Sequence, residues 1–94
     1  MIRTFRGPDS ERVFARGRSR RLPPELHWAA YKKLVLLHAA ESLQDLRILP
    51  GNRLEKLLGD REGEHSIRIN DRWRICFIWR EGDAYDVEIV DYHR

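Results

Sequence analysis

The chain has 94 residues, of which 41% are hydrophobic and 35% are charged, and its formal net charge is +3. This length predicts a single domain, and this composition excludes a disordered chain. No apolar run approaches the roughly 20 residues of a membrane-spanning helix, and the opening stretch "MIRTFRGPDS" lacks the apolar core of a signal peptide. The lone Cys76 excludes an internal disulfide and fits a reducing compartment. We therefore expect a folded cytoplasmic protein that does not enter a membrane.

The positive charge is concentrated in the first part of the chain. Residues 1–40 contain nine Lys or Arg and three Asp or Glu, whereas residues 81–94 contain one basic and five acidic residues. Basic stretches attract polyanions such as nucleic acid. On charge alone, nucleic-acid binding and a merely solvated arginine-rich surface both stay open.

The first elements in chain order are short. Residues 1–5 read as a strand, and residues 8–16 read as a helix that Asp9 or Ser10 would cap. A loop follows over residues 17–24. Four arginines lie within residues 16–21, and we see no residue before Leu22 that could anchor the loop in a core, so we expect it to be flexible.

The strongest predicted helix covers "PELHWAAYKKLVLLHAAESL", residues 24–43. Its apolar residues recur at spacings of three and four, which is typical of a helix with one face on a core. That face comprises Leu26, Ala30, Leu34 and Leu37, and we expect Trp28, Tyr31, Val35 and Ala39 to widen it. His27 and His38 lie on the same helix without nearby residues that could complete a metal site, so we interpret both as surface or packing residues.

The second half of the chain predicts an antiparallel meander. A possible strand over residues 53–58 is followed by a hairpin that turns near residues 70–71, and a last strand begins at residue 87. The alternation of "WRICFIW" puts the aromatic residues on the core face and Arg74 on the open face. Tyr92 should share that open face, and we expect the last strand to lie inside the sheet. The fold class predicted is therefore α+β.

Several kinds of site are excluded by missing motifs. The chain has no glycine-rich phosphate loop, no Cys-x-x-Cys and no His-Glu-x-x-His, so we expect neither a cofactor nor a bound metal. Metal-free RNA cleavage instead needs a base, an acid and a cation that stabilises charge at the phosphorus. His93 titrates in the range of an acid or base, Arg74 can clamp a phosphate, and Tyr92 can donate a proton or stack on a base. The alternative is that His93 and Tyr92 merely end a sheet.

The stretches "PGNRLEKLLGDREGEHSIRINDRWRICFIW" and "VEIVDYH" together resemble the HigB branch of the RelE-like toxins. The resemblance covers nearly the whole chain, 1–94, and implies two N-terminal helices packed on a twisted antiparallel β-sheet of three to four or five strands. It also implies a metal-independent endoribonuclease that cuts mRNA in the 30S decoding site of the ribosome. The implied partner is a HigA-like antitoxin with a helix-turn-helix domain, through which alone the toxin would reach operator DNA.

The resemblance also implies a set of site residues. The implied catalytic residues are Asp91, Tyr92, His93 and Arg74. Many relatives have a lysine where this chain has Leu58, and Lys56 on the same strand parity could reach the same region. The predicted RNA-binding residues are Arg68, Lys56, Arg53, Arg61 and His65. Because Leu58 cannot supply charge, a catalytically weak or inactive scaffold that binds its antitoxin or ribosomal RNA stays open as the alternative.

Overall fold

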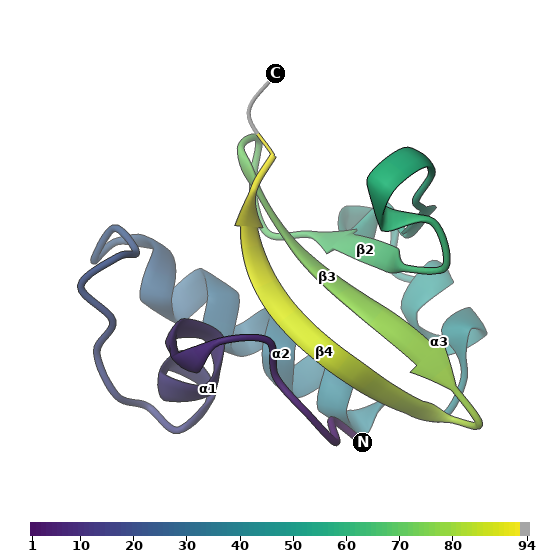
Figure 1. Ribbon diagram of the computed structural model, residues 1–94, viewed down its shortest axis with the longest axis horizontal. Helices are drawn as coiled ribbons and strands as arrows, with labels where there is room; N and C mark the ends of the chain where they lie inside the picture. Colours follow the sequence, from purple (N-terminus) through teal and green to yellow (C-terminus); the bar gives the residue numbers. More distant parts are fainter. Residues whose placement is uncertain (93–94) are drawn as a thin grey trace.

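The computed structural model describes residues 1–92, and within them three α-helices and four strands form an α+β fold (Figure 1). The elements are α1 (Pro8–Phe14), α2 (Leu26–Ala39), α3 (Leu43–Arg47), β1 (Glu55–Lys56), β2 (His65–Arg68), β3 (Trp73–Arg80) and β4 (Asp83–Asp91). The strands form one antiparallel sheet in the order β1-β2-β3-β4, which confirms the predicted fold class. Among the described residues, no helix combines the length and the apolar character needed to cross a membrane.

The long strands β3 and β4 curve across α2, and β4 lies at the edge of the four-stranded sheet (Figure 1). The prediction that the last strand lies inside the sheet is therefore wrong. The first residues of the chain cover part of that edge, since parallel bridges join Ile2 to Ala84 and Phe5 to Val87. The strand predicted over residues 1–5 is therefore present only as these two isolated bridges. The far end of β4 is held differently, by the Tyr92 amide, which donates a hydrogen bond to the Arg72 carbonyl at 2.6 Å.

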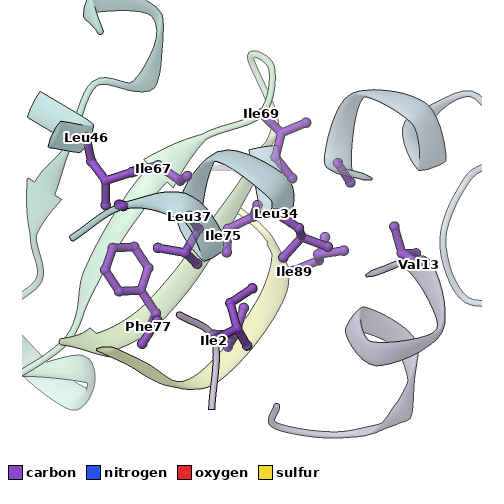
Figure 2. Packing of buried hydrophobic residues seen from close by; sticks show 14 of the residues in the cluster. Ile2, Val13, Leu34, Leu37, Leu46, Ile67, Ile69, Ile75, Phe77 and Ile89 are labelled. Carbon is purple, nitrogen blue, oxygen red and sulfur yellow. The ribbon is translucent and has the colours of Figure 1, made fainter. Parts of the chain in front are cut away.

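The core lies between α2 and the inner face of the sheet (Figure 2). Alternation along β3 buries Ile75 and Phe77, and their neighbours Trp73 and Trp79 pack against the same cluster, as predicted. The labelled residues of this cluster are Ile2, Val13, Leu34, Leu37, Leu46, Ile67, Ile69, Ile75, Phe77 and Ile89. A shift in register between Cys76 and Ile78 bends the strand pair without changing this assignment.

Helix α2 has a second apolar face that the core does not use. Trp28 is 56% exposed and Val35 is 41% exposed, and Ala39 is exposed as well. The prediction that these residues widen the core face is therefore wrong for all three, while Tyr31 is half-buried against the core. The sheet contacts only one side of the helix, so a nearly all-round apolar sequence leaves an apolar stripe in solvent.

The predicted long helix ends earlier than expected because a new helix starts. Helix α2 stops at Ala39, and Ser42 caps α3 in a capping box in which Ser42 and Asp45 satisfy each other's backbone amides. His38 packs as predicted: its Nδ1 accepts a hydrogen bond from the Ile2 amide at 3.1 Å. The ring of His38 also lies 5.3 Å from that of Phe14.

The caps predicted for α1 are wrong, and so is the prediction of an unanchored loop. Neither Asp9 nor Ser10 caps α1. The Ser10 hydroxyl instead accepts a hydrogen bond from the Ile89 amide at 2.8 Å. Asp9 accepts one from the hydroxyl of Ser19, a buried residue of the loop whose amide also donates to Nε2 of His27 at 3.1 Å. Ser19 therefore anchors the arginine-rich loop from within.

Candidate functional site

An open hollow of about 500 Å³ lies where β1, the β2–β3 turn and the end of β4 meet. It is lined by polar residues from segments that are far apart in the sequence. These residues are Arg53, Glu55, Arg68, Asn70, Asp71, Arg74 and Tyr92. Three arginines against two carboxylates make the hollow cationic, which suits a phosphate.

Arg74 forms the floor of this hollow. The residue is 6% exposed, so the prediction that it lies exposed on the open face is wrong. The residue does lie on the outer sheet face, but the guanidinium folds back across β2. There Nε donates a hydrogen bond to the Ser66 hydroxyl at 2.7 Å, and Nη2 donates to the carbonyl oxygens of Arg53 and, at 3.3 Å, Ser66. These bonds fix the guanidinium plane in one orientation.

The remaining nitrogen of the Arg74 fork faces a carboxylate. Nη1 lies 3.7 Å from Oε1 of Glu55, which stands beside Ser66 in the pairing of β1 with β2. The ring of Tyr92 lies 5.8 Å from the Arg74 guanidinium carbon, on the same face, as predicted. An arginine, a carboxylate and a phenol therefore meet around one open space.

A buried amide holds the backbone that carries the Arg53 carbonyl. Asn52 is fully buried; it donates a hydrogen bond to the Leu46 carbonyl at 3.0 Å and accepts one from Nζ of Lys33 at 2.6 Å. The next residue, Arg53, adopts a left-handed conformation with φ 42°. Burial, followed by the charges of Arg68 and Lys32, lowers the pKa of Lys33. The Lys33 amine therefore lies close enough to Arg68 to interact with it electrostatically, although Lys33 does not line the hollow.

The β2–β3 turn is set by Asn70. Its side-chain oxygen accepts hydrogen bonds from the amides of Arg72 and Trp73, both at 2.9 Å. This closed turn brings Arg68 to the rim of the hollow, where it pairs with Asp71. Because Asp71 is fully exposed, we expect an incoming phosphate to compete easily for Arg68.

The predicted catalytic residues of the last strand are separated by the structure. Tyr92 lines the hollow, whereas Asp91 does not. Asp91 accepts hydrogen bonds from Nε of Arg72 at 3.0 Å and from its Nη2 at 2.7 Å, and this bidentate contact raises the pKa of Arg72. We therefore interpret Asp91 as a structural residue that links the β2–β3 turn to β4. His93 lies outside the described residues, and its role stays a prediction.

Three of the predicted RNA-binding residues do not line the hollow. Lys56 pairs with His65, whose ring stacks on Phe77 at 6.1 Å. Both thus lie on the parity opposite Glu55, and neither lines the hollow. The expectation that Lys56 could act in place of the lysine implied at position 58 stays a prediction. Burial, then the charges of Lys56 and Arg47, lowers the pKa of His65.

Arg61 is the third residue outside the hollow. Its guanidinium contacts a carboxylate oxygen of Glu64 and one of Glu88, each at 3.1 Å. Arg53 and Arg68 do line the hollow, and their binding of RNA stays a prediction. Leu58 is 78% exposed and does not line the hollow. Of the described residues, no group of three or more His, Cys, Asp and Glu could hold a metal ion.

Sequence reasoning missed the lining residues Glu55, Asn70 and Asp71. It also missed Ser66 and Lys33, which support the site from outside the lining. In a strand of two residues, alternation is too short to say which side chain faces the hollow, so Lys56 could not be told from Glu55. The carboxylate of Glu55 and the hydroxyl of Ser66 only weakly indicate a role in the site, as possible partners that a buried arginine elsewhere in the sheet needs. Lys33 gives no signal, because it belongs to a distant helix.

Comparisons with known proteins agree with this fold. A family model described as "RelE-like toxin of type II toxin-antitoxin system HigB" matches residues 3–93. The chain is 42% identical to Toxin HigB-1 of Vibrio cholerae over 82% of its own length and 80% of that protein's. It is 31% identical to Endoribonuclease HigB of Proteus vulgaris over 99% and 100% of the two lengths. A solved structure of the YoeB–YefM complex from Staphylococcus aureus superposes with a TM-score of 0.60 at 14% identity, covering 100% of this chain and 99% of that one.

Proposed function

The chain belongs to the HigB family of RelE-like toxins from type II toxin–antitoxin systems, and we propose that it is an endoribonuclease that cuts mRNA on the ribosome. The observation that carries this proposal is the Arg74 guanidinium, fixed at the floor of an open cationic hollow between Glu55 and Tyr92. A fixed guanidinium can stabilise the charge that develops on a phosphate, and a carboxylate and a phenol can exchange protons beside it.

The proposed reaction uses the ribose itself as the nucleophile. Glu55 takes the proton from a 2′-hydroxyl, and the oxygen attacks the adjacent phosphorus to form a 2′,3′-cyclic phosphate. The bond to the 5′-oxygen breaks, and His93, supported by Tyr92, protonates that leaving oxygen. Arg74 stabilises the pentavalent phosphorus between them. The reaction needs no metal, because each proton and each charge has a partner in the chain.

The ribosome supplies what the hollow lacks. The hollow is open and its described lining offers no aromatic pair for stacking bases, so naked RNA would be held without orientation. Binding in the 30S decoding site would fix the mRNA strand relative to Arg74 and complete the site. Arg53 and Arg68 on the rim would contact phosphates. Because its proposed target is the ribosome, we also place the protein in the cytoplasm.

The partner proposed for this toxin is a HigA-like antitoxin with a helix-turn-helix domain. Binding would neutralise the toxin, and the complex would reach operator DNA through the antitoxin alone. The family supports an antitoxin, since its description names a type II toxin–antitoxin system.

The test is cleavage by the purified protein. Labelled mRNA is incubated with it in the presence and absence of ribosomes, and each mixture is repeated with a chelator at a concentration that leaves ribosomes intact. We expect cleavage with ribosomes only, unchanged by the chelator. Efficient cutting of free RNA, or loss of cutting in the chelator, would contradict the proposal.

One observation favours a second function. The resemblance to the HigB toxins implies a lysine where this chain has Leu58, and among the described residues the hollow is lined by no cation other than its three arginines. A scaffold that binds its antitoxin or ribosomal RNA without cutting would explain this substitution. Strong induction in bacteria separates the two functions, because a toxin arrests growth unless the antitoxin is present, and a scaffold leaves growth unchanged.

A further inference from the structure

A second hollow, of about 510 Å³, lies between α1, the arginine-rich loop and the start of α2. It shares no lining residue with the hollow around Arg74. Helix α1 and the loop lie on one flank of the molecule, and the β2–β3 turn lies elsewhere (Figure 1). Its floor is apolar, with Val13 and Leu22 buried beneath it, and Pro24 and Tyr31 form its walls. We call this hollow the α1–α2 groove.

The rim of the groove is cationic. Arg16, Arg18 and Arg20 all line it, and Lys32 stands beside it with its Nζ 5.6 Å from the Trp28 ring. Arg16 adopts a left-handed conformation with φ 65°, which ends the α1 segment and turns the chain towards α2.

An aromatic pair organises this rim. Trp28 and Tyr31 stack with their ring centroids 5.8 Å apart, and the Arg16 guanidinium lies 5.2 Å from the first ring and 4.7 Å from the second. No carboxylate belongs to the lining of the groove. Arg16 is thus held by the two rings, and the charge of the rim arginines stays available to an anionic partner.

The groove continues along α2 as an apolar stripe, in which Trp28 and Val35 are exposed and Tyr31 between them is half-buried. Trp28, Tyr31 and Val35 follow one another at spacings of three and four and so lie on one helical face. From Trp28 to Val35 the stripe runs for roughly 10 Å. An apolar groove that leads onto an apolar stripe has the shape that receives one side of an amphipathic helix.

We propose that the α1–α2 groove and the α2 stripe are the docking surface for an acidic amphipathic helix of the antitoxin. This inference rests on the proposed antitoxin partner and adds where it binds and by what chemistry. Apolar side chains of that helix would fill the groove over Val13 and Leu22, and its carboxylates would meet Arg18 and Arg20 on the rim. Trp28 and Tyr31 would be its anchors, since buried aromatic residues contribute most to such interfaces.

Charge and lining favour this occupant over two others. A second copy of this chain would bring its own basic rim against the first, and like charges would oppose the contact. RNA would match the arginines and could stack on Trp28 and Tyr31, but it would leave the aliphatic floor over Val13 and Leu22 unfilled, because nucleic-acid interfaces are polar and wet. Only an acidic peptide with apolar residues matches both parts of the groove.

The experiment measures the affinity of the full chain for the antitoxin encoded beside it. Val35→Glu places a carboxylate on the stripe, where it would repel the carboxylates of the acidic antitoxin helix. Arg20→Glu reverses one charge on the rim. Val35 and Arg20 have exposed side chains, so both variants should fold. Ile48→Glu and Arg47→Glu are the matched controls: Ile48 is 63% exposed, Arg47 is exposed too, and neither lines the groove. Titration calorimetry at low and high salt gives the dissociation constants.

We expect Val35→Glu to weaken binding about tenfold or more at both salt concentrations. Arg20→Glu should weaken it several-fold at low salt and less at high salt, because salt screens the exposed charge. Both controls should bind like the wild type. Wild-type affinity in both groove variants, or loss in the controls alone, would overturn the docking site while leaving the antitoxin itself in place.

Two further outcomes would give the groove to another occupant and overturn the proposal. One is a wild-type dimer by light scattering that Val35→Glu converts to a monomer. The other is binding of labelled single-stranded RNA that both groove variants lose while they keep their antitoxin affinity. Complete absence of antitoxin binding by the folded wild type would instead contradict the partner named under the proposed function.

Discussion

The hollow around Arg74 and the α1–α2 groove around Arg16 have nearly equal volumes, about 500 and 510 Å³, but they hold their arginines differently. Arg74 is buried and bound through hydrogen bonds to Ser66 and to the Arg53 carbonyl. Arg16 lies over two aromatic rings. Hydrogen bonds fix a guanidinium in position and plane, whereas ring stacking leaves it free to tilt and slide.

This difference separates two uses of the same side chain. A reaction needs a cation within a few tenths of an ångström of its target, and a buried network supplies that accuracy. A docking surface needs attraction and adaptable contact area, which a stacked arginine supplies. If the contrast is right, changes around Arg74 abolish chemistry and spare antitoxin binding, and changes in the groove do the reverse.

The largest effect is expected from His93→Ala. Removing a general acid lowers the rate by ~10²–10⁴-fold. Cleavage of mRNA on ribosomes measures the rate, and calorimetry with the antitoxin should give the wild-type affinity. If the folded variant cuts at the wild-type rate, His93 has no part in the mechanism and the chemistry belongs to the described residues of the hollow alone.

Glu55→Gln tests the base by keeping the shape of the side chain and removing its ability to take a proton. We expect a loss in the same range, ~10²–10⁴-fold. Stability should hardly change, because Glu55 is about half exposed and its pairing with Arg74 is solvated. Glu62→Gln, an exposed carboxylate outside the hollow, is the control. Equal cleavage by both variants would leave Glu55 without a catalytic role.

Arg74→Ala should lower the rate by ~10²–10³-fold by removing charge stabilisation at the phosphorus. It should also lower the free energy of unfolding by about 1–3 kcal/mol, because the buried Ser66 hydroxyl loses its charged partner. This effect is larger than for a surface substitution. Arg80→Ala, an exposed arginine on the same strand, is the control in both measurements. Retained activity in a folded Arg74→Ala protein would make Arg74 a structural residue.

A smaller effect, on the pH dependence of stability, is expected from His65. This residue lines neither the hollow around Arg74 nor the α1–α2 groove. Its pKa in the folded state is lowered below the ordinary value of a histidine, chiefly by burial. The unfolded chain therefore binds more protons as the pH falls through about 6.5, so the free energy of unfolding decreases from pH 7 to pH 5. His65→Phe should remove part of that decrease, as measured by urea unfolding at each pH. An unchanged pH dependence would mean that His65 is solvated.

The smallest effect concerns Cys76, on the sheet next to Arg74. Burial raises the pKa of its thiol to about 11, so little reactive thiolate forms at neutral pH. We expect iodoacetamide to leave Cys76 intact in the folded protein at pH 8 and to alkylate it in urea, as followed by mass spectrometry. Rapid alkylation without urea would indicate that the sheet beneath Arg74 opens. The hollow around Arg74 would then lack the rigid floor that is expected to distinguish it from the α1–α2 groove.

Much of the fold could be predicted from residues close together in sequence. The spacing of Leu26, Ala30, Leu34 and Leu37 indicated the buried face of α2, and all four are buried. The alternation from Trp73 to Trp79 likewise indicated the inner face of β3. Such patterns work because burial on a helix or strand repeats with the period of the element. The end of α2 was missed, because Ser42 and Asp45 form a local capping box that competes with an apparently continuous helix.

The sequence by itself determined the family, the fold class and the position of Tyr92 on the sheet face that carries Arg74. Only the tertiary structure decided what Arg74 contacts, because its partners Ser66 and Arg53 lie 8 and 21 residues away. Only the tertiary structure also decided that one apolar side of α2 has no core to face. Periodicity records how many apolar sides a helix has, but the number of sides that become buried depends on which other elements pack against it.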